Sequence, residues 1–215
     1  AISGFAIVQW HNVMRIFWTL IIAPIAGLVS AYIFTKIVYF LTSTATVKIN
    51  ELFKKLEVLA SCFYAISHGA NDGQKAIGII TFSLIVLGLY KPPEGSFAPR
   101  WVIIACAVCI TLGIIFGGWG VIKTIGMNIY KIKHVNGFVA QSSAAAVIYI
   151  ASILGLPLST THVITTSVMG TGAAERMKGV RWSIGRNVFI TWLFTIPSTA
   201  VVSFIIYQIL YFFVR

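Results

Sequence analysis

Long uncharged runs constrain this chain more than any other feature. Residues 16–35 contain neither a charged side chain nor a histidine, and residues 101–122 and 187–214 are uncharged. About 20 apolar residues suffice for one helical membrane crossing. Hydrophobic residues make up 58% and charged residues 10% of the chain, against roughly 45–50% and 25% in a soluble domain. The composition therefore predicts an all-α, polytopic helical membrane protein and excludes soluble enzymes and disordered chains.

The positive charge of the chain has a membrane explanation. There are 16 Lys and Arg residues against 5 Asp and Glu, which gives a formal net charge of +11. In a soluble chain this excess would indicate nucleic-acid binding, but here most cations lie in short loops between apolar runs. We therefore expect a lipid bilayer, and no nucleic acid, as partner. Three cysteines, an odd number that all lie in apolar stretches, predict neither a disulfide framework nor a zinc site.

The pattern of apolar and polar stretches divides the single membrane domain, residues 1–215, into six segments. We expect a membrane helix at 14–42, an interfacial amphipathic helix at 43–57, a broken membrane helix at 58–90, a membrane helix at 101–122, a re-entrant or double-crossing segment at 137–174 and a membrane helix at 187–214.

The distribution of cations predicts the topology. If the segment 137–174 returns to the side where it started, loops 43–57, 123–135 and 176–186 share one side and hold 10 cations, against 4 on the other. A single crossing would give 7 on each side. The positive-inside bias favours the uneven distribution, so we expect the basic side to be cytoplasmic and the C-terminus to lie outside.

Two polar segments, residues 67–75 and 157–162, interrupt the apolar runs. A straight helix over residues 58–90 would be about 50 Å long, whereas the hydrocarbon core is about 30 Å thick. It must overshoot or be broken, and its Gly and Asn-Asp turn residues favour a break. Non-helical backbone at this depth is tolerated where it lines a cavity, and broken helices hold the substrate in many secondary transporters.

The residue types at these breaks suit two kinds of ion. Ser159, Thr160 and Thr161 precede an apolar run, so their hydroxyls would join the unpaired N–H groups of a helix start. This neutral, donor-rich set suits a tetrahedral oxyanion. Asn71 and Asp72 precede the run from residue 73 to 89 and offer oxygens that suit Na⁺ or a proton.

Structural roles compete with these interpretations. Ser, Thr, Asn and Asp are also the preferred helix caps. Asp72 is the only acid inside an apolar stretch, which indicates function, but an ion pair with Lys75 three residues on is the alternative. We expect His68 and His162 to be structural hydrogen-bonding groups, with proton transfer by His162 as the alternative. Gln141 is expected to join helices.

At this point two motifs resemble those of a known family. Gly69-Ala-Asn-Asp-Gly-Gln-Lys-Ala76 and Gly155-Leu-Pro-Leu-Ser-Thr-Thr-His-Val163 are similar to the GANDxxxA and G-x-P-x-S-T-T-H signatures of the inorganic phosphate transporter (PiT) family. Its members have two inverted repeats, each with both motifs, whereas this chain has one copy of each. The chain therefore resembles one half, the C-terminal one, of an inverted-repeat transporter, with the N-terminal half as an absent partner. A half-length protein would instead need an antiparallel homodimer, against which the charge bias argues.

The resemblance implies secondary symport of inorganic phosphate, driven by H⁺ or Na⁺, with no cofactor and no enzymatic activity. Ser159, Thr160 and Thr161 would coordinate phosphate. Asn71 and Asp72 would hold the coupling cation, which is Na⁺ if transport is sodium-coupled. Other residues expected to line the site are Gly69, Gln74, Lys75, Gln141 and His162.

Two departures from the family pattern bear on the coupling ion. Many members have a small or Asn-containing stretch where this chain has Gln74 and Lys75, and a Glu where it has Gln141. A lysine supplies a fixed positive charge, and loss of the Glu removes a carboxylate that could hold Na⁺. We therefore predict proton coupling, as in the bacterial low-affinity branch, in a bacterial or archaeal inner membrane.

Three alternatives stay open at this point. The first is a permease for sulfate or another oxyanion, or for a metal–phosphate complex, on the same scaffold. The second is a membrane-embedded hydrolase, for which Ser159 and His162 lie three residues apart but lack a third, orienting group. The third is a structural subunit of a membrane assembly.

Overall fold

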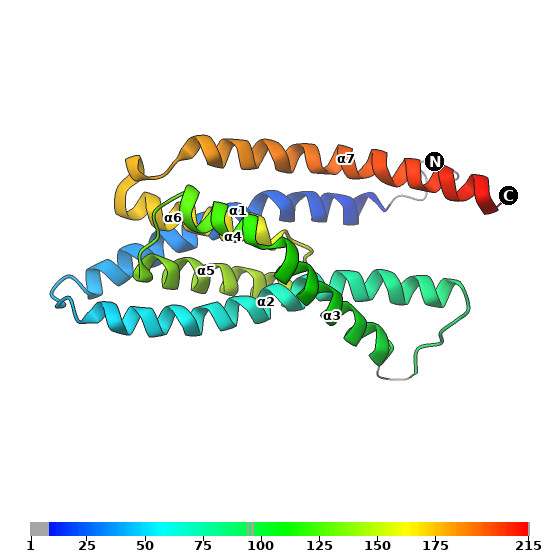
Figure 1. Ribbon diagram of the computed structural model, residues 1–215, viewed down its shortest axis with the longest axis horizontal. Coiled ribbons are helices and arrows are strands. Elements are labelled where there is room, and N and C mark those ends of the chain that lie inside the picture. The colour runs from blue at the N-terminus through cyan, green and yellow to red at the C-terminus, as the bar shows by residue number, and fades with distance from the viewer. Residues whose placement is uncertain (1–8, 94, 96, 215) are drawn as a thin grey trace. The chain divides into compact units, whose positions relative to one another are not determined.

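The computed structural model describes residues 9–93, 95 and 97–214, and every regular element in this range is a helix (Figure 1). In chain order the helices are α1 (Trp10–Leu41), α2 (Ile49–Val86), α3 (Arg100–Gly117), α4 (Trp119–Lys123), the π-helix η2 (Thr124–Asn128), α5 (His134–Ile153), α6 (Thr160–Arg176), the 3-10 helix η3 (Met177–Gly179) and α7 (Trp182–Val214). The chain divides into two compact units after Val180. The second unit consists of α7, and the other helices belong to the first.

Four helices in the described ranges are long and apolar enough to cross a membrane. They are α1, α3, α5 and the part of α7 from Gly185 to Phe212. α2 is not among them because its polar residues lower its hydropathy, and α6 has only 17 residues. The architecture confirms the prediction of an all-α, polytopic membrane protein.

Close packing between α1 and α6 forms the centre of the first unit. The buried side of α1 presents a small residue at every fourth position: Thr19, Ala23, Gly27, Ala31 and Thr35. This spacing places them on one face of the helix, and small side chains let two helix backbones approach closely. The hydroxyl of Ser167 in α6 donates a hydrogen bond of 3.2 Å to the carbonyl oxygen of Gly27. The two helices run in the same direction (Figure 1).

α2 and α5 also run in the same direction, with a constant register. Near their starts, the Ser61 hydroxyl donates to Gln141 Oε1 at 2.5 Å. Further along, Asn71 Nδ2 donates to Ser152 Oγ at 2.9 Å. Both contacts join residues 80 or 81 positions apart. The α5–α6 hairpin is therefore set against α1 and α2, with α5 beside α2 and α6 beside α1.

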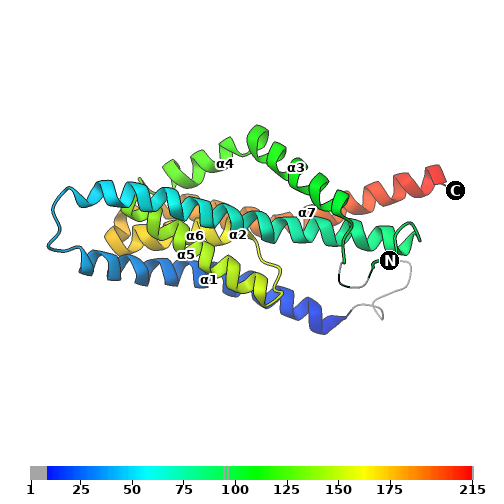
Figure 2. The same ribbon diagram turned by 90° about the horizontal axis from the view of Figure 1, so that it is seen from below.

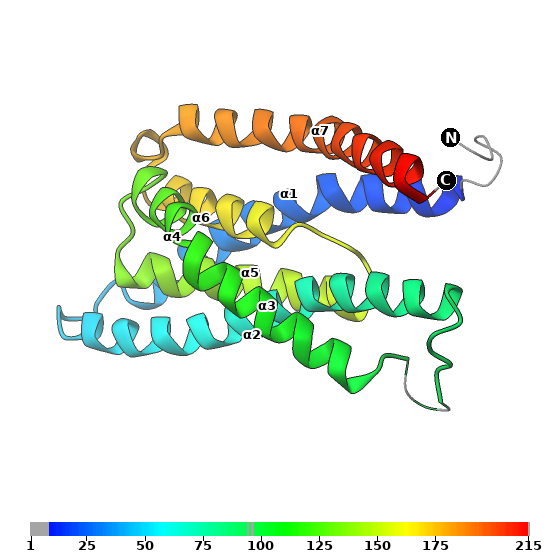
Figure 3. The same cartoon turned by 45° about the vertical axis from the view of Figure 1, so that its right-hand side comes forward.

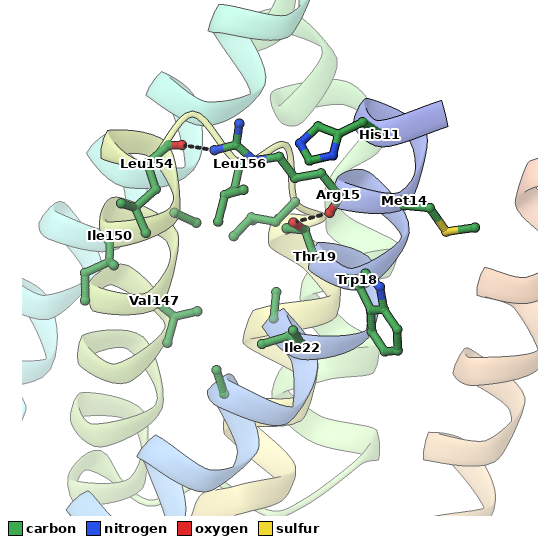
Figure 4. Close-up of a pocket in the computed structure, with 14 residues that line it drawn as sticks. His11, Met14, Arg15, Trp18, Thr19, Ile22, Val147, Ile150, Leu154 and Leu156 are labelled. Carbon is green, nitrogen blue, oxygen red and sulfur yellow. Dashed lines mark hydrogen bonds between the residues drawn. The ribbon is translucent and has the colours of Figure 1, made fainter. Parts of the chain in front are cut away.

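The hairpin ends partway along α2. Its closing segment, residues 154–159, is named here the hairpin tip. Lys75 Nζ, on α2, donates to the carbonyl oxygen of Leu158 at 2.6 Å, and α2 has another 11 residues beyond Lys75. Figure 3 shows α2 continuing past the end of the hairpin. On the α1 side, Arg15 Nη2 donates to the carbonyl oxygen of Leu154 at 3.0 Å (Figure 4). The arrangement is that of a helix pair that enters and returns; whether it re-enters or crosses the membrane twice stays a prediction.

Several connections of the first unit lie at one end, named here the basic end. Residues 42–48, 129–133 and 177–180 lie at this end (Figures 1 and 2). The cations in or next to these connections are Lys48, Lys54, Lys55, Lys131, Lys133, Arg176 and Lys178. This grouping agrees with the pattern from which a cytoplasmic basic side was predicted.

The structure corrects the prediction for α2. The interfacial helix expected at 43–57 and the break expected in 58–90 are replaced by one continuous helix, Ile49–Val86. The polar stretch contains no proline, and each glycine costs only about 1 kcal/mol relative to alanine in a helix. Asp72 contacts His68 and Lys75, at spacings of four and three residues, and these contacts require helical turns. With 38 residues the helix is about 57 Å long, so it overshoots the hydrocarbon core.

The helix expected at 101–122 is divided in the structure. α3 ends at Gly117 and α4 begins at Trp119, with the second residue of a Gly-Gly pair between them. Glycine is a poor helix former, which favours an end at this point. The basic connector that follows contains the π-helix η2. In Figure 2, α3 and α4 stand away from α1, α5 and α6.

A carboxylate at the basic end joins three parts of the first unit. Glu175 Oε2, on α6, accepts hydrogen bonds from the Tyr39 hydroxyl at 2.8 Å and the Tyr130 hydroxyl at 2.7 Å. Asn136 Nδ2 donates to the same oxygen at 3.1 Å, and Lys133 Nζ forms an ion pair with Oε1. Burial raises the pKa of Glu175, but the four donors outweigh it and lower the pKa from 4.5 to about 2.

This depressed pKa predicts acid sensitivity. Ionised Glu175 stabilises the fold above its unfolded pKa of 4.5, and this contribution is lost as the pH falls towards 2. The Glu175→Gln variant should lower the free energy of unfolding near neutral pH by about 1–3 kcal/mol and weaken the pH dependence between 5 and 3. Thermal unfolding in detergent across this range measures both. A variant whose acid sensitivity equals that of the exposed control Glu51→Gln would contradict the prediction.

The α1–α6 contact predicts a second, local effect. A methyl group at Gly27 would lie 2.9 Å from both the Val163 carbonyl oxygen and Thr166 Oγ1. The Gly27→Ala variant should therefore lower the stability by about 1–3 kcal/mol, because the helix backbones must separate. The matched control is Gly113→Ala in α3, where a methyl group meets nothing within 4 Å. The control should be neutral or stabilising, since alanine favours helix. Equal melting temperatures for the two variants would rule the close contact out.

Candidate functional site

The Asp72 carboxylate, partway along α2, joins this helix to the start of α6. Lys75 Nζ lies 3.0 Å from Oδ1. Thr160 Oγ1 donates to Oδ2 at 3.2 Å, and His68 Nε2 lies 3.1 Å from the same oxygen. Both carboxylate oxygens are thus engaged by groups that can donate hydrogen bonds. The acid singled out in the sequence is the centre of the candidate site.

The hydroxyl groups of Ser159, Thr160 and Thr161 lie at the start of α6, as predicted. Ser159 is the N-cap, and its side chain accepts a hydrogen bond of 3.4 Å from the backbone N–H of His162. Thr160 is buried and contacts Asp72, whereas Thr161 faces a neighbouring cleft. The sequence allowed two roles for these hydroxyl groups, helix capping and anion binding. Ser159 does cap α6. The three hydroxyls therefore differ in their surroundings although they are adjacent.

Asn71 and Asp72 are not at a helix start. Both lie inside α2, so their own N–H groups belong to the helix and only their side chains are available to a ligand. They also contact different helices of the hairpin, because Asn71 donates to Ser152 of α5 while Asp72 accepts from Thr160 of α6. Asn71 Oδ1 is buried and has no hydrogen-bond partner among the described residues. Such an acceptor is open to a ligand that supplies a donor or a cation.

Lys75 has a second contact besides Asp72. Its ammonium group donates to the carbonyl oxygen of Leu158 at 2.6 Å, so one cation touches both α2 and the hairpin tip. On the other side of Asp72, His68 Nδ1 lies 3.0 Å from the Tyr64 hydroxyl. The sequence had suggested an ion pair for Lys75 and a structural hydrogen-bonding role for His68. Both contacts are present, and the link to Leu158 adds a connection that the sequence did not predict.

A cleft of about 1020 Å³ opens beside this cluster, bounded by α2, α5, α6 and the segment from α3 to η2. It is named here the inner cleft. Its lining includes Tyr64, His68, Gly69, Gln141 and Thr161. Toward the basic end its lining includes Glu57, Lys133 and His134, with His134 Nδ1 2.6 Å from Glu57 Oε2. The inner cleft therefore leads from the basic end to the start of α6.

Only some of the other predicted site residues lie at the candidate site. Gln141 accepts from Ser61 and so joins α5 to α2, which agrees with its predicted helix-joining role. Gln74 is exposed on α2, and His162 lies in the first turn of α6. Sequence reasoning missed Tyr64 and Ser152. Tyr64 could have been found from its spacing of four and eight residues before His68 and Asp72, but nothing local indicates Ser152.

A second cavity, of about 760 Å³, lies on the other side of the hairpin tip (Figure 4). Its lining is mostly apolar and includes Trp18, Ile22 and Leu156, with Arg15 at the side where its guanidinium reaches Leu154. Such a lining does not suit an anion. Within the described ranges, His, Cys, Asp and Glu form no group of three or more that could hold a metal ion.

Comparison with known proteins gives a consistent result. Residues 42–203 match the model of the "Phosphate transporter family". The chain is 39% identical over 211 residues to a "Probable low-affinity inorganic phosphate transporter" of Bacillus subtilis (strain 168), covering 98% of this chain and 63% of the relative. A protein of the same name in Rhizobium meliloti (strain 1021) is 35% identical, with 95% and 61% covered. One in Mycobacterium tuberculosis (strain ATCC 25618 / H37Rv) is 32% identical, with 99% and 51% covered.

A solved structure shares the fold. "The sodium-dependent phosphate transporter" superposes with a TM-score of 0.80 at 23% identity, covering 92% of this chain and 66% of that one. The chain thus spans between half and two thirds of the length of these proteins. Their names are those of transporters, not of enzymes.

The hydrogen bond between Asn71 and Ser152 predicts that removing the Ser152 hydroxyl lowers the stability of the protein. In the Ser152→Ala variant the buried Asn71 amide loses its acceptor, so the melting temperature should fall by an amount equivalent to about 1–3 kcal/mol. The control is Ser83→Ala, because the exposed Ser83 hydroxyl donates only to the carbonyl of Ile79 in its own helix. Thermal unfolding in detergent measures both. Equal effects in the two variants would show that the buried contact contributes nothing.

Proposed function

Because this chain belongs to the phosphate transporter family, we propose that it forms the substrate site of a symporter for inorganic phosphate. One observation carries the proposal: a helix start rich in hydroxyl groups meets a carboxylate and a lysine partway along an apolar helical unit. Intramembrane ionisable residues of this kind mark substrate and ion pathways. Secondary transporters place such sites where a helix is interrupted near the bilayer midplane.

Phosphate would bind where the hairpin tip meets the start of α6. The first N–H groups of a helix lack internal partners and carry partial positive charge, which favours an anion. Ser159, Thr160 and Thr161 add hydroxyl donors at the start of α6, and the Lys75 ammonium group lies against the tip at Leu158. A tetrahedral oxyanion with several acceptor oxygens matches this set of donors.

The proton is the coupling ion that we propose, with Asn71 and Asp72 as the residues that couple its movement to that of phosphate. Lys75 already supplies a fixed positive charge at Asp72, and a neutral amide, Gln141, lines the inner cleft. These features lessen the need for an additional metal cation. Sodium held by oxygens of Asn71 and Asp72 is the alternative, since the structural neighbour is named sodium-dependent.

Transport would use the inner cleft as the route between the site and the basic end. Alternating access in such folds comes from rocking of one repeat against the other around a fixed site. The second repeat, an N-terminal half, would supply the opposite wall, with a homodimer as the alternative. We place the protein in a bacterial or archaeal inner membrane, with the basic end cytoplasmic and the C-terminus outside.

The uptake assay described below also distinguishes phosphate from other substrates that the same fold could carry. Sulfate is also a tetrahedral oxyanion, and a metal–phosphate complex presents similar oxygens. A structural subunit should tolerate the loss of the Asp72 charge without functional effect.

The proposal is tested by uptake of radiolabelled phosphate into proteoliposomes that contain the full-length transporter, with an imposed proton gradient, with and without sodium. The Asp72→Asn and Thr160→Ala variants should each reduce uptake at least about tenfold, because each loses a polar contact to the site. Matched controls are Glu51→Gln and Thr111→Ala, both exposed and outside the site. The controls should transport as the wild type does.

The arms of this assay separate the alternatives. Uptake that follows the proton gradient at constant sodium supports proton coupling, whereas a requirement for sodium at constant pH would refute it. Sulfate uptake without phosphate uptake would keep the fold and discard the substrate. Undiminished phosphate uptake by the Asp72→Asn variant would remove Asp72 from the mechanism.

A further inference from the structure

The ammonium group of Lys75 lies between two oxygens of different origin. Asp72 Oδ1, on the same helix, is 3.0 Å away, and the carbonyl oxygen of Leu158, in the hairpin tip, is 2.6 Å away. The lysine side chain is partly buried, with 39% of it exposed. The ion pair with Asp72 alone would need only the helical spacing of three residues. The contact with Leu158 is additional, because it ties α2 to a segment 83 residues further along the chain.

These two oxygens are of the kinds that bind an alkali cation. Transporter sites for Na⁺ use carboxylates together with carbonyl oxygens of non-helical backbone, and the Leu158 carbonyl belongs to such a segment. Na⁺ and a lysine ammonium group carry the same single positive charge. Either one compensates the Asp72 carboxylate and draws the hairpin tip towards α2. A sodium ion does not fit at this point while the ammonium group is within hydrogen-bond distance of both oxygens.

We propose that the Lys75 ammonium group occupies a cation site between Asp72 and Leu158 and thereby determines which coupling ion the transporter accepts. This inference rests on the proposed symport and deepens it. With Lys75 present, the site holds a tethered cation that cannot leave, so sodium neither binds there nor moves with the substrate. Removing the side chain vacates the site and leaves its two oxygens facing each other, which converts it into a binding site for Na⁺.

Three variants of the full-length protein separate the vacated site from the lost charge. Lys75→Ala removes both the charge and the volume. Lys75→Asn also vacates the ammonium position, is smaller than lysine and adds a polar oxygen. Lys75→Met removes the charge but keeps an unbranched side chain in place. The control for loss of a lysine elsewhere is Lys36→Ala, since Lys36 is exposed on α1 and lies over the ring of Tyr32.

Melting temperatures in detergent are compared in 100 mM NaCl and 100 mM choline chloride, without phosphate. For a site with an affinity of about 10 mM, NaCl should raise the melting temperature of Lys75→Ala and Lys75→Asn by about 2–4 °C over choline chloride. The wild type, Lys75→Met and Lys36→Ala should show no sodium-specific rise. In proteoliposomes, phosphate uptake by Lys75→Ala should fall at least about tenfold without sodium and rise when sodium is added.

The melting temperatures test the role of Lys75 without depending on the transport assay. An equal sodium-specific rise in the wild type, or folded Ala and Asn variants that show none, would overturn the inference. So would the failure of both variants to fold in either salt, since Na⁺ would then not replace the ammonium group. If the wild type takes up no phosphate, the proposed function fails, while the melting temperatures still decide whether Lys75 occupies a cation site.

Discussion

The architecture depends on how a short non-helical segment is held inside an otherwise helical, apolar unit. Backbone carbonyls in such a segment need hydrogen-bond donors, because lipid supplies none. Here two cations from different helices supply them: Arg15 of α1 reaches Leu154, and Lys75 of α2 reaches Leu158. The hairpin tip is therefore held from both sides, and its position partway along α2 brings the start of α6 to Asp72.

The continuity of α2 matters for the same reason. A single helix keeps Tyr64, His68, Asp72 and Lys75 at intervals of one turn, so that each contacts the next. A bend at the glycines would turn the later residues away from the earlier ones. The polar residues that looked like a break thus form a connected row on a regular helix, and the irregular backbone is confined to the hairpin tip.

The sequence predicted the start of α6 better than the stretch around Asp72. A proline followed by Ser159 and two threonines is a strong local signal for a helix start, and the structure places the start of α6 there. The stretch around Asp72 carries equally strong turn residues, yet its contacts at helical spacing outweigh them. The pairing of Asn71 with Ser152 and of Lys75 with Leu158 joins residues more than 80 positions apart, and single-sequence patterns contain no information about such partners.

The two ends of the α5–α6 hairpin are held by polar contacts of different kinds. At the base, one carboxylate, that of Glu175, gathers donors from α1, from the connector before α5 and from α5 itself. At the tip, the attachments to α2 pass through Asp72 and Lys75, groups that a charged ligand can compete for. A ligand that takes over the attachments at the tip would leave the hairpin as a beam fixed only at its base. The tip would then be displaced first, while the base stays in register.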